Sequence, residues 1–114
     1  MKTAALKKTC SVCLVIFGLM LTAMELGAQP IQLRGIRSCG EWVKEKGVQA
    51  VGNQTWLIGY LSGIAVATNK SFLRGTDNQS IYLWVDNYCQ ANPLMSLADA
   101  GEILYFELVK QKNL

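Results

Sequence analysis

The stretch Ile81-Tyr-Leu-Trp-Val-Asp-Asn-Tyr-Cys89 decides the fold class, because its apolar residues recur at helical spacing. Positions i, i+3, i+4, i+7 and i+8 would share one face of a helix and form a regular core stripe. We expect this helix to begin near Asp77 or Ser80 and to end before Asn92-Pro93, which can also start the next helix. The residues of the stripe are Ile81, Trp84, Val85, Tyr88 and Cys89.

Helical patterns lie on both sides of this stretch. Ser38-Cys-Gly-Glu41 has the pattern of a capping box, so a first helix is expected there, weakened or ended by Gly47. Asn53 is a plausible N-cap for a second helix that runs to about Thr68. This second helix contains no charged residue and is expected to be the most buried one. The fourth helix carries Leu97, Ala100, Gly101, Leu104 and Leu108 at helical spacing.

Small residues recur every four positions in the second helix, at Gly59, Gly63 and Ala67. Each interior glycine costs about 1 kcal/mol relative to alanine, so close approach of another helix is expected to offset this cost. Packing within the chain is the first interpretation and the seam of a homodimer is the second. Trp42 and Trp84 are also expected to pack between helices.

The first 28 residues have the parts of a secretory signal peptide. A basic start (residues 1–8) precedes a short apolar run (residues 10–24) and small residues before Pro30. Cleavage is expected after Ala28, with Ala23 as a second candidate site and an uncleaved anchor as the alternative. The mature domain would span residues 29–114 and stay outside the membrane. Three lysines and one glutamate leave with the signal, so the net charge falls from +3 to +1 and nucleic-acid binding loses its support.

The same cleavage determines which cysteines remain in the mature domain. Cys39 and Cys89 remain, and an even pair in an exported small domain is typical of one disulfide. Two free thiols or a metal pair are the alternatives, but a zinc site would lack further ligands in a chain without histidine.

The composition argues against an enzyme. No histidine means no histidine general base and no Ser-His-Asp or Cys-His arrangement. A carboxylate pair can hydrolyse glycosides, but the helical acids have plainer roles as caps, dipole partners or solvated groups. We therefore expect no catalytic residue, no cofactor and no metal. These acids are Glu41, Asp86, Asp99 and Glu102.

Three motifs precede the closing amphipathic helix: Cys39-x-x-Trp42, Gly59-Tyr60-x-x-Gly63 and Trp84-x-x-x-Tyr88-Cys89-x-x-x-Pro93. With that helix, they resemble the HdeA-like superfamily of small periplasmic helical proteins. Within it the chain is most similar to the Rap/Tai immunity proteins, which protect bacteria against peptidoglycan-cleaving effectors of type VI secretion. The resemblance covers about residues 38–110. It implies an all-α four-helix bundle in the periplasm, pinned by one disulfide and acting by binding a secreted amidase, often as a dimer. An acid-stress chaperone and an accessory subunit of a secreted assembly are the alternatives.

Such immunity proteins obstruct a catalytic cleft with a loop, and the corresponding loop here is residues 69–76. Phe72 and Leu73 would be apolar anchors, flanked by the cations Lys70 and Arg74. The alternative is that the two apolar side chains fold back over the core.

Overall fold

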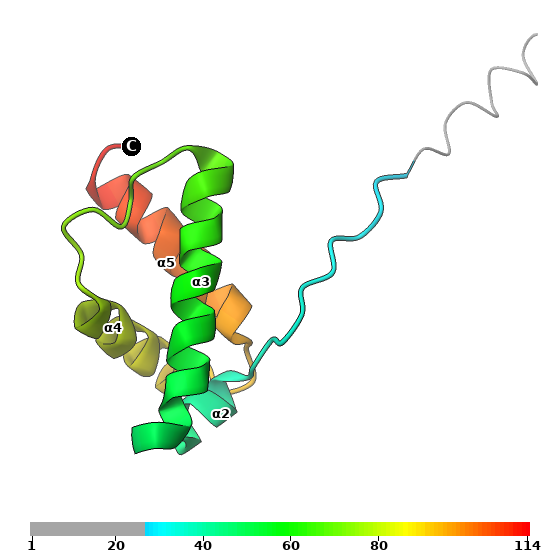
Figure 1. Ribbon diagram of the computed structural model, residues 1–114, viewed down its shortest axis with the longest axis vertical. Helices are drawn as coiled ribbons and strands as arrows, with labels where there is room; N and C mark the ends of the chain where they lie inside the picture. The colour runs from blue at the N-terminus through cyan, green and yellow to red at the C-terminus, as the bar shows by residue number, and fades with distance from the viewer. Residues whose placement is uncertain (1–26) are drawn as a thin grey trace, which may run out of the picture. The chain divides into compact units, whose positions relative to one another are not determined.

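The computed structural model describes residues 27–114, so the predicted signal peptide lies almost wholly outside the described residues. Within this part of the chain, all helices belong to one compact unit, Leu33–Leu114 (Figure 1). The described residues include no helix with the length and hydropathy needed to cross a bilayer.

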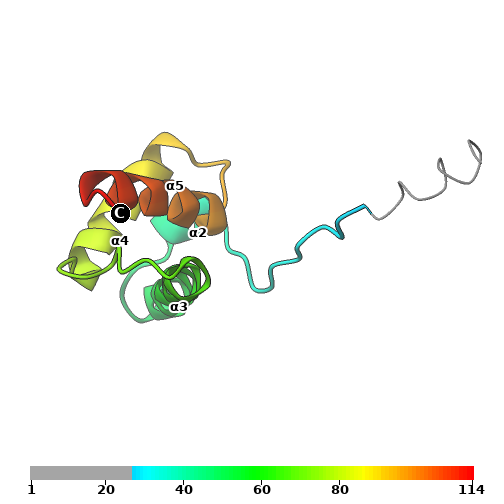
Figure 2. The same cartoon turned by 90° about the horizontal axis from the view of Figure 1, so that it is seen from above.

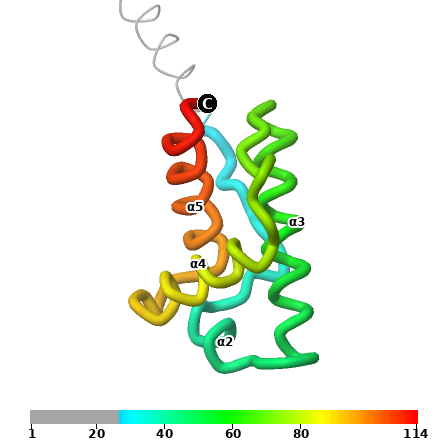
Figure 3. Tube along the Cα trace, turned by 90° about the vertical axis from the view of Figure 1, so that its left-hand side faces the viewer, coloured from blue at the N-terminus to red at the C-terminus, as the bar shows by residue number. Residues whose placement is uncertain are grey.

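The prediction of a helical domain is confirmed. The described chain has four α-helices and no strand: α2 (Cys39–Lys44), α3 (Ala50–Thr68), α4 (Asn78–Ala91) and α5 (Leu97–Gln111). A short 3-10 helix, η2 (Gly47–Gln49), leads directly into α3. The long helices α3 and α5 lie side by side, and α2 packs mainly against α4 (Figures 2 and 3).

The predicted disulfide is present. Cys39 in the first turn of α2 is bonded to Cys89 in the last turn of α4, with an S–S distance of 2.08 Å, and neither residue is exposed. Around it lies a core to which every α-helix contributes, because each carries apolar residues at helical spacing. The buried apolar side chains include Trp42, Leu57, Leu61, Phe72, Ile81, Val85, Leu97, Leu104 and Leu108.

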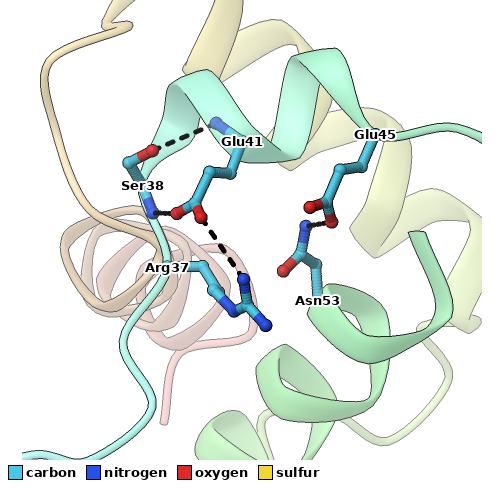
Figure 4. A network of polar contacts seen from close by, with 5 residues as sticks. All are labelled: Arg37, Ser38, Glu41, Glu45 and Asn53. Atoms are coloured by element: carbon cyan, nitrogen blue, oxygen red, sulfur yellow. Dashed lines mark hydrogen bonds and ion pairs between the residues drawn. The ribbon is translucent and has the colours of Figure 1, made fainter. Parts of the chain in front are cut away.

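The starts of α2 and α5 are joined as a pair. Ser38 and Ser96 form an isolated antiparallel bridge, in which the amide of Leu97 donates to the carbonyl of Arg37 at 2.8 Å. Both serines are N-caps, and both capping boxes are complete. Figure 4 shows the first of them, between Ser38 and Glu41, which was predicted. The orphan amides of two helices are therefore satisfied at one place.

The predicted N-cap of α3 is wrong. The helix begins at Ala50, three residues before Asn53, because η2 runs into it and the carbonyls of Gly47 and Val48 accept the Ala50 amide. No side-chain cap is present, and Asn53 lies inside the helix with 1% of its surface exposed.

The prediction that α3 is the most buried helix is also wrong. Only Asn53, Leu57 and Leu61 are buried among its 19 residues, whereas six residues of α5 are buried. An apolar composition all round a helix does not say how many neighbours it has. In this chain α3 packs chiefly on α5, so its opposite side is left exposed.

Candidate protein-binding surface

The predicted partner-binding loop is folded onto the domain. Phe72 is fully buried and meets the ring of Tyr105 edge-on, with 5.0 Å between the ring centroids. Leu73 is half-buried against the core, while Arg74 is exposed. Phe72 therefore covers the core, as in the alternative interpretation, and is not accessible to a partner in this conformation.

Lys112 holds this loop in place. Its ammonium group donates to the carbonyl oxygen of Phe72 at 2.6 Å, to that of Arg74 and to the hydroxyl of Thr76 at 2.9 Å. All three of its protons are used. No local sequence pattern predicts this role of Lys112, because the contact spans 36 to 40 residues of the chain.

Gly59 and Gly63 do not mark close packing within the chain. A β-carbon built on either glycine would find nothing within 4 Å among the described residues. The prediction that another element of this chain approaches them is wrong for residues 27–114, and the homodimer seam remains as the untested interpretation.

The glycine that does mark a close approach is Gly101 in α5. A β-carbon there would lie 2.9 Å from Cδ1 of Tyr60, which packs across it from α3. The sequence placed Gly101 in the apolar stripe of its helix. A stripe of apolar residues does not show which of its small residues has a neighbouring aromatic ring packed directly against its backbone.

The side of α3 that faces away from α5 is an exposed surface of small, uncharged residues, which we call the α3 face. Ser62 donates its hydroxyl proton to the Ile58 carbonyl at 2.7 Å, so this proton is already used within the helix. No charged residue occurs anywhere in α3. The face consists of Thr55, Gly59, Ser62, Gly63 and Val66.

The two tryptophans assigned to helix packing lie inside the domain. Trp42 is buried in the core cluster. Trp84 is half-buried, stacks on Tyr88 with 5.4 Å between ring centroids, and donates its indole proton to Glu107 of α5 at 2.7 Å. Trp84 thus connects α4 to α5.

The carboxylates that cap helices have lowered pKa values. The Ser38 backbone amide lowers the pKa of Glu41, and the Ser80 amide does the same for Asp77. The Ser96 hydroxyl, followed by the Ser96 amide, lowers the pKa of Asp99. Each acid is held as an anion at a helix start, which is a structural use of its charge.

Two hollows lie beside the start of α3 and share the side chains of Glu45 and Asn53. The first, of about 380 Å³, also includes Trp42, Tyr82 and Asp86, and the second, of about 610 Å³, faces Arg37. No group of three or more histidine, cysteine or acidic residues in the described chain is placed to hold a metal.

The α3 face and the cations of the 69–76 loop are two exposed features on the surface of the described chain. No protein-family model, curated protein or solved structure matches this chain.

Proposed function

We propose that this protein is an exported binding protein whose copies pair through the α3 face. The observation that carries the proposal is the exposure of Gly59 and Gly63 in the middle of a helix. Each costs about 0.5–1 kcal/mol relative to alanine, and nothing in the described chain offsets that cost. A second backbone in close contact would offset it.

The chemistry of the α3 face favours a second copy as the occupant. A two-fold interface places the same surface on both sides, so it must be complementary to itself. A face of small residues without charge suits this condition, because α3 itself brings no like charges together and lets two backbones approach, while Arg34 lies at the edge of the face beside Thr55 and Gly59. A helix with charges of one sign on the same side would repel its copy.

We further propose that the pair acts as an immunity protein against a peptidoglycan-cleaving effector of type VI secretion. The resemblance to the Rap/Tai proteins supports this role, and the disulfide suits an oxidising compartment such as the periplasm. The 69–76 loop would meet the effector through Lys70 and Arg74, which form no ion pair within the described residues. Phe72 would support the loop from below.

The first test changes Gly59→Arg, which adds bulk and charge to the α3 face while improving helix propensity. Asn87→Arg, at an exposed position of α4, is the matched control. Sedimentation should show that Gly59→Arg abolishes a dimer that the parent and control form. A parent that is monomeric at every concentration would contradict pairing.

The second test concerns the effector. The protein purified after export should inhibit a type VI peptidoglycan amidase at stoichiometric amounts, and Lys70→Glu with Arg74→Glu should weaken inhibition at least tenfold. Unchanged inhibition by the double variant would show that the loop is not the contact, and no inhibition of any such amidase would contradict the immunity role.

An acid-stress chaperone is the second candidate, favoured by the three capping carboxylates. Their pKa values are lowered in the folded state, so their stabilisation is present at neutral pH and is lost as the pH falls through those lowered values. The α2, α4 and α5 starts would then weaken below about pH 4. The two roles are separated by measuring, against pH, the size of the protein and the binding of a dye that detects exposed apolar surface. A chaperone opens at low pH and suppresses the aggregation of client proteins.

A further inference from the structure

Asn53 carries an unusual buried polar group. Its Nδ2 donates to Oε2 of Glu45 at 2.7 Å, which fixes the orientation of the amide, since a carboxylate accepts only from the nitrogen. Its Oδ1 is buried and has no hydrogen-bond partner among the described residues. Buried polar atoms are nearly always paired in folded proteins, so this acceptor calls for a donor.

The unpaired oxygen lies beneath the surface of a hollow, because Oδ1 itself is buried while Asn53 lines that hollow. Figure 4 shows that Oδ1 of Asn53 points away from Glu45, on the side where the Arg37 side chain lies. The hollow of about 610 Å³ is on this side and lies between α2 and the start of α3. Its volume falls in the range of small-ligand sites. Besides Asn53 it is lined by Arg37, Glu41, Lys44, Glu45, Gln49 and Gly52.

The base and the rim of this hollow favour bound groups of opposite charge. At the base, Oδ1 of Asn53 and the Glu45 carboxylate are acceptors, so a group that binds there must donate, and a positive charge suits it best. At the rim, Lys44 is exposed and forms no ion pair within the described chain, so it favours an anionic group. A ligand with an ammonium group next to a carboxylate matches both.

Arg37 lines the same hollow, and its side chain lies on the side toward which Oδ1 of Asn53 points (Figure 4). Among residues 27–114 its guanidinium is paired with Glu41 alone, at 3.3 Å, and about half of its side-chain surface is exposed. Exposed pairs of this kind are weak, so the side chain can move aside at little cost or turn its free nitrogen toward an incoming carboxylate.

We propose that this hollow binds a small zwitterion, namely an α-amino acid, whose ammonium group donates to Asn53 and Glu45 and whose carboxylate meets Lys44. The site uses none of the residues of the α3 face and none of the 69–76 loop. Its test is therefore independent of the proposed pairing and of the immunity role.

The test is a titration of the isotope-labelled protein, purified after export, followed through the side-chain amide signal of Asn53. The probes are L-alanine, ethylammonium and acetate. Alanine should shift the signal in a saturable manner with a dissociation constant in the millimolar range, because the site is small, polar and open to water. Ethylammonium should bind more weakly, and acetate should leave the signal unchanged.

Lys44→Gln provides the sharper measurement, because it is a surface change that preserves the fold. It should lower the affinity for alanine by about tenfold, the effect of one charge-assisted contact, and leave ethylammonium binding unchanged. The matched control is Lys46→Gln, which removes a neighbouring lysine that pairs with Asp86 outside this hollow and should change neither affinity.

Three outcomes would overturn the proposal. In the first, the Asn53 signal shows no saturable response to alanine. In the second, Lys44→Gln and Lys46→Gln lower the affinity of the protein for alanine equally. In the third, Arg37→Gln destabilises the protein as much as Asn53→Leu does, which would show that Arg37 itself satisfies the buried oxygen.

Discussion

Helices α3 and α5 pack against each other, yet they are built differently. The start of α5 has a complete capping box, and charged residues share its outer side with Ile103 and Phe106. By contrast, α3 has no side-chain cap, no charge and two exposed glycines in its interior. The first pattern makes a helix stable within its own domain. The second pattern makes α3 less stable than it could be, and it is the feature on which the proposed pairing rests.

The difference extends to how each helix is anchored. The starts of α2 and α5 are held together by the bridge between Ser38 and Ser96, and the disulfide joins α2 to α4. Helix α3 is connected to this group chiefly by its contacts with α5, by the two loops at its ends and by the hydrogen bond from Asn53 to Glu45. Four experiments test this contrast between an anchored group and one exposed helix.

Removing the disulfide should have the largest effect. The chain-entropy model gives about 4 kcal/mol for a ring of about 51 residues, so Cys39→Ala with Cys89→Ala should lower the free energy of unfolding by roughly that amount. Urea unfolding measures it, and the parent protein in reductant is the control. A loss below about 1 kcal/mol would show that the helix contacts alone hold α2 to α4.

Gly101→Val comes next. Its side chain would collide with the Tyr60 ring at the contact between α5 and α3, and overpacking of this kind costs about 1–3 kcal/mol. The matched change on α3 is Gly59→Val, which points into open space and should leave stability unchanged or slightly raised. Equal losses in thermal unfolding would contradict the contrast between the two glycines.

Ser96→Ala should cost about 1 kcal/mol at neutral pH, because it removes the N-cap of α5. Since the Ser96 hydroxyl is the main cause of the lowered pKa of Asp99, the loss should shrink as the pH falls through that pKa and the carboxyl becomes protonated. Urea midpoints at pH 7 and in acid measure this change. Ser62→Ala on α3 is the control and should show no such pH dependence.

Gly59→Ala should have the smallest effect. It should stabilise the monomer by about 0.5–1 kcal/mol at low protein concentration, since the added methyl group meets nothing within the described chain. At high concentration it should weaken the proposed dimer, because the two backbones would be held apart. Sedimentation and thermal unfolding at two concentrations separate these opposite effects, and a destabilised monomer would contradict the open environment of Gly59.

Much of the fold was predictable from local patterns. The capping box at Ser38 and the apolar stripe of α4 follow from residue types at short spacing. The pairing of Cys39 with Cys89 was predicted because these are the two cysteines left after the expected signal cleavage. The burial of α3 was not predictable, because hydrophobicity around a helix does not reveal which side a neighbour covers. The burial of Asn53 depends on a 3-10 turn that starts the helix three residues early.

The candidate sites were less predictable than the fold. Phe72 between two cations has the composition of an interface. Its ring contact with Tyr105 and the hydrogen bond from Lys112 to its carbonyl oxygen join segments far apart in the sequence, so no local pattern predicts them. The hollow beside Asn53 likewise combines residues from two helices and the segment before α2.

The position of the disulfide in the chain has a consequence for protease resistance. Because Cys39 and Cys89 enclose α3 and the loop that follows it, a protease that cuts the backbone once between them releases no fragment while the disulfide is intact. The nicked protein would stay a single covalent molecule, and electrophoresis would reveal two pieces only after reduction. The α3 face and the 69–76 loop both lie inside this ring, so one cut there would leave them attached to the rest of the domain.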